Sequence, residues 1–197
     1  MPANRSRKTI NMNRMKTVIN ITNTQRKLKI NQKSVRYIVK NSIEKLYCGS
    51  YEIDIIFCSE NYIKKLNRLY RNQDKATDVL SFEIKEQVGD IFYIGEIYIA
   101  PSTAEKNFIR YRNFWEKDDW VDSDGKEGQD GQEENENPKN RKNYCKKGLG
   151  RELALLIIHG ILHLFGYAHD EEHKLDLDDP GYDKEMKYMQ NFLYKEL

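Results

Sequence analysis

The spacing of hydrophobic residues predicts short strands in the first half of the chain and helices throughout. Apolar and β-branched residues are contiguous or alternate at 17–22, 51–57, 78–82 and 93–99, which predicts strands. Apolar residues three or four positions apart predict helices at 32–46, 60–70 (capped by Ser59), from Pro101 onward, at 151–165 and at 183–196. We therefore expect an α+β domain in which a small mixed β-sheet packs with helices.

Residues 116–147 depart from this pattern. They are rich in Asp, Glu, Asn and Gly, turn basic toward their end, and contain few apolar residues. Such a stretch cannot bury enough surface to offset the entropy of ordering, so we expect a disordered charged insertion. A lid, or a mimic of nucleic-acid charge, is the functional alternative. A chain of 197 residues fits one domain, so we expect a basic flexible extension at 1–14 and a single domain at 15–197.

The net charge of +2 conceals a strongly basic first quarter. No Asp or Glu occurs from Met1 to Ile43, whereas Lys and Arg recur throughout this stretch. A basic surface favours polyanions, above all nucleic acid. A solvated face or a flexible tail would have the same composition. A transit peptide is also Arg-rich, but these first residues lack its amphipathic apolar face.

Cysteine usage and hydropathy bear on the cellular compartment. Cys48, Cys58 and Cys145 are odd in number and lack Cys-x-x-Cys spacing, which indicates a reducing compartment without a disulfide framework. The sequence shows neither a signal peptide nor an apolar run long enough to cross a membrane. We therefore expect a soluble, cytoplasmic protein.

Three of the four histidines lie in one short run, His159-x-x-x-His163-x-x-Gly166-x-x-His169. On a helix, His159 and His163 project from the same face. Gly166 can end the helix in a left-handed turn, so that His169 returns to the same point. Three imidazoles with a fourth position open to water are typical of a catalytic zinc site. Hydrogen-bonded core histidines are the alternative interpretation, and His173 is best interpreted as a solvated loop residue.

The residue after the first histidine distinguishes between zinc chemistries. A metallopeptidase of the His-Glu-x-x-His type carries its general base there, and this chain has Gly160. Without that carboxylate, peptide hydrolysis lacks its proton shuttle. A phosphodiester needs mainly an activated water, whose pKa zinc lowers toward about 7, and positive charge for the transition state.

A second segment, 66–82, leaves a helix at Arg71, crosses a polar loop and enters a strand at Thr77-Asp78. Loops after such elements often line sites. Arg71 is a candidate phosphate clamp, because its guanidinium can bind phosphate oxygens in a bidentate manner. A surface arginine paired with Asp74 is the alternative interpretation.

Together the two segments resemble the YbeY family of bacterial rRNA-maturation endoribonucleases. The family's signatures are His-Gly-x-Leu-His-Leu-x-Gly-Tyr-Asp-His and Leu-Asn-x-x-Tyr-Arg-x-x-Asp-x-x-Thr-Asp-Val-Leu-Ser-Phe, which correspond here to 159–169 and 66–82. Gly95-Glu96-Ile97 is similar to the family's Gly-Asp-Ile strand, and Glu185-Met186 to its last helix. The resemblance covers 15–197 apart from the insertion.

The resemblance implies a zinc-dependent endoribonuclease for single-stranded RNA, acting in maturation of the small-subunit rRNA 3′ end and in ribosome quality control. The helix at 151–165 would be a zincin-like metal helix, and His159, His163 and His169 would bind one Zn²⁺ ion. His159 and Arg71 would be catalytic, and the basic N-terminal face would hold RNA. Expected partners are single-stranded rRNA and ribosomal subunits, with ribosomal proteins as further candidates and no membrane.

Three features depart from the family pattern. Ala168 stands where the family has Asp before the third histidine, so a carboxylate that could orient an imidazole is missing unless Asp170 replaces it. The insertion after Trp115 is longer than in the pattern, and about ten extra residues separate His169 from the last helix.

Two other functions stay open at this point. A metallopeptidase shares the histidine spacing but lacks the base at Gly160. A non-catalytic ribosome-assembly factor with structural zinc is compatible with Ala168. Nickel, copper or manganese would also bind three imidazoles, because affinity order alone does not fix the metal.

Overall fold

The computed structural model of the chain describes residues 15–107, 138–167 and 184–197. In chain order the labelled elements are β1 (Thr17–Asn23), α1 (Gln32–Leu46), β2 (Tyr51–Phe57), α2 (Glu60–Arg71), β3 (Val79–Val88), β4 (Ile91–Ile99), α4 (Pro138–Leu164) and α5 (Lys184–Lys195). A further helix begins at Pro101 and is described as far as Asn107.

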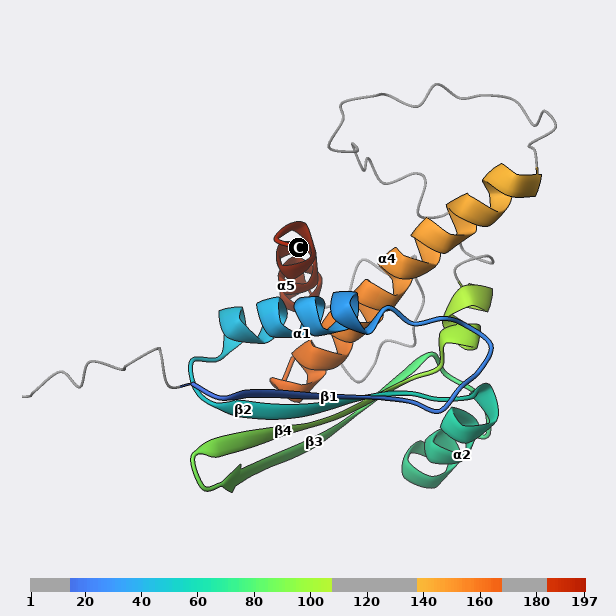
Figure 1. Ribbon diagram of the computed structural model, residues 1–197. Helices are drawn as coiled ribbons and strands as arrows, with labels where there is room; N and C mark the ends of the chain where they lie inside the picture. The colour runs from blue at the N-terminus through green and yellow to red at the C-terminus, as the bar shows by residue number, and fades with distance from the viewer. Residues whose placement is uncertain (1–14, 108–137, 168–183) are drawn as a thin grey trace, which may run out of the picture.

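The strands form one mixed sheet in the order β1-β2-β4-β3. β1 pairs with β2 and β2 with β4 in parallel, whereas β3 pairs with β4 as an antiparallel hairpin. The hairpin turns at Gly89-Asp90, where Gly89 has a φ of +60°. β3 is thus an edge strand, and no other strand of the described residues pairs with its outer side (Figure 1). The candidate site described below lies along this edge.

The hairpin bends at Gly95, where both ladders shift register. Gly95 has a φ of +151°, and a Cβ there would lie 2.2 Å from the carbonyl oxygen of Phe82. On β3, Lys85 lies within the register shift between Glu83 and Glu86 and adopts a left-handed φ of +52°. Only glycine can satisfy both the dihedral angle and the close approach. The bulge brings this part of the sheet against Leu164 at the end of α4.

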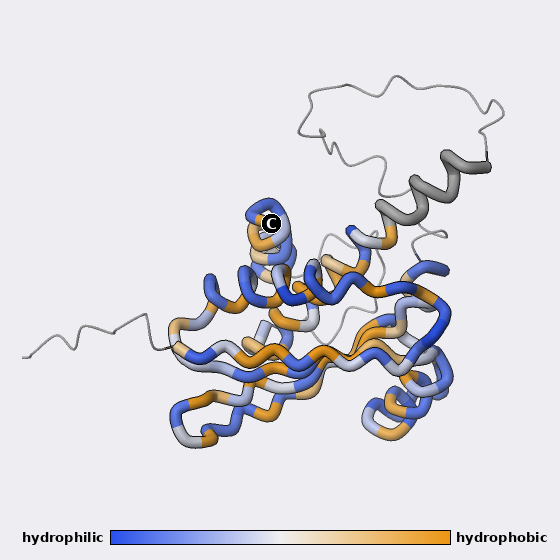
Figure 2. Tube along the Cα trace, in the orientation of Figure 1, coloured by the Kyte–Doolittle hydropathy of each residue, from blue (hydrophilic) through white to orange (hydrophobic). Residues whose placement is uncertain are grey.

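Helices cover the two faces of the sheet unequally. α1, α4 and α5 lie on one face and α2 on the other (Figure 1). The main core lies between the sheet and the first two of these helices, with fully buried side chains that include Val39, Ile53, Ile97, Ile157 and Ile161. Hydrophobic segments concentrate in the strands, and they alternate with hydrophilic ones along α1 (Figure 2). The parallel strand β2 is buried along its length in the alternating pattern that the sequence predicted.

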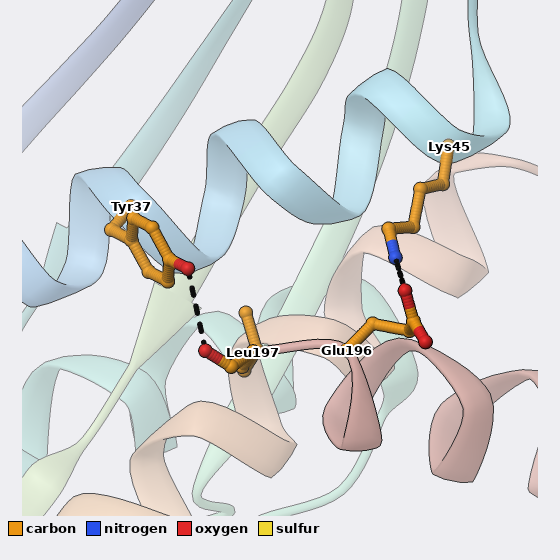
Figure 3. A network of polar contacts seen from close by, with 4 residues as sticks. All are labelled: Tyr37, Lys45, Glu196 and Leu197. Carbon is orange, nitrogen blue, oxygen red and sulfur yellow. Dashed lines mark hydrogen bonds and ion pairs between the residues drawn. The ribbon is translucent and has the colours of Figure 1, made fainter.

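The C-terminal helix α5 docks against both α4 and α1. Met186 and Leu193 are buried with Ile158 and Leu162 of α4. Lys45 of α1 forms a 2.6 Å ion pair with Glu196, and the Tyr37 hydroxyl donates to the Leu197 carbonyl at 3.3 Å (Figure 3). These contacts fix the position of α5 relative to α4, and that position matters for the histidines.

The predicted α+β class, with a small mixed sheet packed by helices, is confirmed. Within the stretch 116–147, which was expected to be a disordered insertion, residues 138–147 are part of α4, which begins at Pro138. Proline is favoured at a first helical position, and the Lys and Arg that follow have high helix propensity, so polarity alone did not prevent a helix. Residues 116–137 and the extension 1–14 lie outside the described residues, and the single-domain organisation stays a prediction.

Two further predictions concern disulfide bonds and membrane-spanning helices. Among the described side chains, Cys48 and Cys58 are free thiols. Within the described parts of the chain, no helix is long and apolar enough to cross a membrane.

Candidate active site

The C-terminal end of α4 is shaped by Gly166, as the sequence predicted. Gly166 has a φ of +89°. Its N–H donates to the His163 carbonyl at 2.9 Å, and the Tyr167 N–H donates to the Leu162 carbonyl at 3.0 Å. This pair of bonds is a Schellman cap, which needs a left-handed residue at this position. The cap turns the chain back over the last helical turn, so that Tyr167 lies beside His163.

The two helical histidines face one another at the base of this turn. Their Nε2 atoms are 3.1 Å apart, and their ring planes are nearly perpendicular, at 88°. Each Nδ1 atom instead faces an oxygen. His163 Nδ1 lies 2.8 Å from the Tyr167 carbonyl oxygen, and His159 Nδ1 lies 3.0 Å from Oε1 of Gln190 on α5.

These contacts determine which ring nitrogens carry hydrogen. A carbonyl oxygen only accepts, so each Nδ1 donates and each Nε2 keeps a lone pair. In the neutral rings, Nε2 of His159 therefore faces Nε2 of His163 at 3.1 Å, where a metal ion or a proton shared by the two nitrogens can lie. Metal-binding histidines are commonly held in this way, with the second ring N–H donating to a carbonyl or carboxylate.

The geometry fits a zinc ion as far as the described residues go. Two nitrogens about 2.1 Å from one tetrahedral ion are roughly 3.4 Å apart, close to the 3.1 Å between the Nε2 atoms. His169 and Ala168 lie outside the described residues, as do Asp170 and His173. Accordingly, the part of the chain that the structure describes holds no cluster of three ligating side chains. His169 as the third ligand therefore stays a prediction.

Arg71 and His163 line the same pocket, although they come from opposite faces of the sheet. The pocket has a volume of about 210 Å³ and is lined by Arg71, Ser81, Glu83, His163, Gly166 and Tyr167. It lies along the edge strand β3. Arg71, at the last position of α2, reaches it from one side, and the end of α4 reaches it from the other. The structure thus brings together Arg71 and His163, which are 92 residues apart and which the sequence had singled out as a candidate phosphate clamp and a candidate metal ligand.

The alternative role of Arg71 as a partner of Asp74 is not what the structure shows. Asp74 pairs with Lys64 at 3.3 Å, and among the described residues Arg71 has no ion pair. The loop that follows is held from within. Asn67 is buried and donates to the Lys75 carbonyl at 2.8 Å, and Asn72 ends α2 in a left-handed conformation. Arg71 is therefore held at a fixed helix end with its guanidinium available for an anion.

The structure gives a steric reason for glycine at position 160, in addition to the missing general base noted from the sequence. A Cβ on Gly160 would lie 2.9 Å from Cγ2 of Ile97 and 3.0 Å from Oγ of Ser81. The helix can approach the sheet this closely only because this position has no side chain. A glutamate general base, which a metallopeptidase carries at this position, has no room here.

Glu152 lies on α4 before the two histidines, near the start of the part of this helix whose side chains are described. It lies seven residues before His159, and therefore on the same face of the helix. Burial, and to a smaller extent the charge of Asp78, raises the pKa of its carboxyl to about 7. Glu152 does not line the pocket, so its buried carboxyl bears on stability rather than on binding.

Comparisons with known proteins identify the family of the chain. The sequence profile described as Endoribonuclease YbeY matches residues 20–118 and 135–196. This chain belongs to the YbeY endoribonuclease family. The profile skips 119–134, which lie inside the charged stretch, and its matched ranges include Arg71 and all three motif histidines.

Individual members of the family match two thirds or more of this chain. The chain is 32% identical to an Endoribonuclease YbeY of Thermotoga maritima over 78% of this chain and 72% of that protein. It is 35% identical to the one of Halalkalibacterium halodurans, over 67% of this chain and 70% of the relative. A Clostridium botulinum member is 32% identical over 79% and 87%, respectively. A solution structure of a Thermotoga maritima protein aligns with a TM-score of 0.48 and 26% identity, covering 91% and 88% of the two chains.

Sequence reasoning missed three residues of this YbeY-family site. Ser81 and Glu83, two positions apart on β3, both line the pocket. The side chain of Gln190 on α5 contacts His159. Ser81 lies inside the segment 66–82, but nothing there singled out its hydroxyl. For Gln190 a signal existed, because it is a polar residue next to the inward-facing Met186, Met189 and Leu193 of the last helix.

Proposed function

We propose that this protein is a zinc-dependent endoribonuclease for single-stranded RNA, acting in maturation of the small-subunit rRNA 3′ end and in ribosome quality control in the cytoplasm. The observation that carries the proposal is the pocket that Arg71 and His163 share, where Nε2 of His163 lies 3.1 Å from Nε2 of His159. The curated relatives are named endoribonucleases, which supports the same reaction class.

Each group of the proposed site would have a distinct role in RNA cleavage. His159, His163 and, as predicted, His169 would hold the zinc ion. Bound there, zinc would supply a Lewis acid and lower the pKa of a water molecule. Arg71 would bind two non-bridging oxygens of the scissile phosphate and stabilise the charge that develops on them. Glu83, which pairs with Lys85 at 2.7 Å, supplies a carboxylate that can accept a proton from the attacking group.

The RNA partner would be single-stranded rRNA within ribosomal subunits, with ribosomal proteins as further contacts. The basic N-terminal quarter was expected to hold this RNA, but some of its cations already have partners within the chain. Arg36 donates to the Ile19 carbonyl at 2.6 Å, and Lys40 and Lys45 pair with Glu44 and Glu196. The cations of α2, which lie next to the pocket, therefore add to the RNA-binding surface in this proposal.

The decisive experiment combines metal analysis with cleavage of single-stranded rRNA by a nuclease-free preparation. We expect about one zinc per chain and cleavage by the wild type, with losses of at least about 100-fold for His159→Ala and Arg71→Ala. Lys187→Ala, which removes an exposed cation on α5 away from the proposed RNA-binding surface, serves as the control for charge. Intact RNA after incubation with the zinc-loaded wild type would contradict the proposal. RNA binding that survives His159→Ala, without turnover by the wild type, would favour an assembly factor with structural zinc.

A further inference from the structure

Four aromatic rings form a continuous row on the α2 side of the sheet. Ring centroids are 6.2 Å apart for Tyr62 and Tyr98, 5.6 Å for Tyr98 and Phe82, and 4.9 Å for Phe82 and Tyr70. Phe82 and Tyr98 are half-buried between the sheet and α2, whereas Tyr70 is 61% exposed. The Tyr70 ring is therefore braced edge-on by Phe82 while most of its surface faces solvent.

This exposed ring lies next to the pocket, on the other side of β3. Arg71, the next residue along α2, lines the pocket, and so do Ser81 and Glu83, which flank Phe82 on β3. Side chains alternate between the faces of a strand, so Phe82 packs on the α2 side while its two neighbours face α4. Because β3 is the edge of the sheet, a flexible chain can pass around it from Tyr70 to the pocket.

Exposed cations lie along α2 and in the loop that follows it, and Arg71 is the next residue after Tyr70. Lys65, Arg68, Arg71 and Lys75 are exposed, and across the described ranges none of them has an ion pair. The acidic Asp74 is paired with Lys64. An exposed aromatic ring among cations is the combination that proteins use for single-stranded nucleic acid, where bases stack and phosphates bind the charges. A protein partner would have to be strongly acidic to fit the same surface.

We propose that Tyr70 is a base-stacking subsite for single-stranded RNA and holds the base of a nucleotide next to the phosphate that Arg71 binds. The proposal rests on the proposed function, because the strand is the substrate of that pocket. Any base can stack on tyrosine, so the subsite orders the strand without reading its sequence. In a duplex the bases stack on one another and pair, so the subsite also favours single strands over double-stranded RNA.

Affinities for a matched pair of single-stranded RNAs test the subsite. One is an intact oligonucleotide, and the other has the same length and phosphates but carries abasic nucleotides. The full-length wild type, Tyr70→Ala, Tyr70→Trp and Arg71→Ala are compared by fluorescence anisotropy, with the RNA checked for integrity on a gel. Tyr188→Ala is the control, because Tyr188 is 68% exposed on α5. The melting temperature of each variant reports folding.

We expect Tyr70→Ala to weaken binding of the intact RNA about tenfold, which is about 1.4 kcal/mol, and to leave binding of the abasic RNA unchanged. Tyr70→Trp and Tyr188→Ala should bind like the wild type, and Arg71→Ala should weaken both RNAs equally. Equal losses on both RNAs for Tyr70→Ala, or no loss on either, would overturn the subsite.

The same data separate the two proposals. A wild type that cleaves RNA, combined with a Tyr70→Ala variant that binds normally, overturns the subsite and leaves the endonuclease. Binding of the wild type that depends on Tyr70 and on the bases, without cleavage, overturns the endonuclease and leaves the subsite. A wild type that binds neither RNA overturns both.

Discussion

The Nδ1 atom of His159 on α4 lies 3.0 Å from Oε1 of Gln190 on α5. This contact fixes the ring so that Nε2 points toward His163. The position of Gln190 depends in turn on how α5 docks, through its buried Met186 and Leu193 and through Lys45 and Tyr37 of α1 (Figure 3). The orientation of a proposed metal ligand is therefore set by the C-terminal helix.

Replacing Gln190 with leucine should weaken metal binding without unfolding the protein. Leucine has a similar size, so α5 can still dock, but the His159 N–H loses its acceptor. Loss of such a partner typically costs 10–100-fold in metal affinity, and we expect a loss in that range in competition with a chromophoric zinc chelator. Asn191→Ala, an exposed neighbour on α5, should bind zinc like the wild type. Unchanged affinity in Gln190→Leu would show that the contact does not orient the ring.

Two glycine-to-alanine substitutions, one within α4 and one in its C-terminal cap, should have opposite effects on stability. At Gly166 the φ of +89° is strained for alanine, so Gly166→Ala should destabilise the fold by about 1 kcal/mol and loosen Tyr167 against His163. Gly150 lies inside the helix with open space around it, so Gly150→Ala should stabilise by about 0.5–1 kcal/mol. Urea unfolding measures both. A Gly166→Ala variant that is as stable as the wild type would contradict the cap.

The helix end at Gly166 could be predicted from the sequence because its causes are local. A glycine after an apolar helical run suffices to predict a left-handed cap, and the i, i+4 spacing suffices to place His159 and His163 on one face. Ser59 as the cap of α2 is also local, and the structure confirms it, since its side chain accepts from the Tyr62 N–H.

The position of Gln190 could not be predicted, because it depends on how α5 packs on α4 across a segment of the chain. The same holds for the pocket, which exists only because β3 is the edge of the sheet and α2 and α4 lie on opposite faces. Pairing among the charges of 64–74 is likewise a matter of packing: spacing favoured an Arg71–Asp74 pair, and the fold instead pairs Asp74 with Lys64.

Restoring the missing carboxylate at Gly160 should not create a peptidase. Gly160→Ala already places a Cβ 2.9 Å from Ile97 and 3.0 Å from Ser81, so we expect a loss of about 1–3 kcal/mol. Gly160→Glu should be worse and should show no chelator-sensitive cleavage of an unstructured protein. Thermal melting and a casein assay provide the measurements. A folded Gly160→Glu variant that cleaves casein in a zinc-dependent way would revive the metallopeptidase.

Glu152 should make the stability of the protein fall as the pH rises. Burial and Asp78 raise the pKa of Glu152 from 4.5 to about 7 in the folded state. Between these values the unfolded chain has already lost the proton while the folded chain keeps it. The stabilising contribution is thus fully present below about pH 4.5 and is lost as the pH rises through 7. At about 1.36 kcal/mol per pKa unit, reduced for partial exposure, the loss is on the order of 1–2 kcal/mol.

Glu152→Gln tests this effect, because glutamine keeps the shape of the protonated carboxyl and cannot ionise. We expect the variant to match the wild type at pH 5 and to exceed its unfolding free energy by about 1–2 kcal/mol at pH 8. Urea unfolding at pH 5, 6, 7 and 8 measures the difference. Glu86→Gln, an exposed carboxylate on β3, controls for the loss of one negative charge. A difference between Glu152→Gln and the wild type that stays constant across this range would show that Glu152 ionises alike in the folded and unfolded chain.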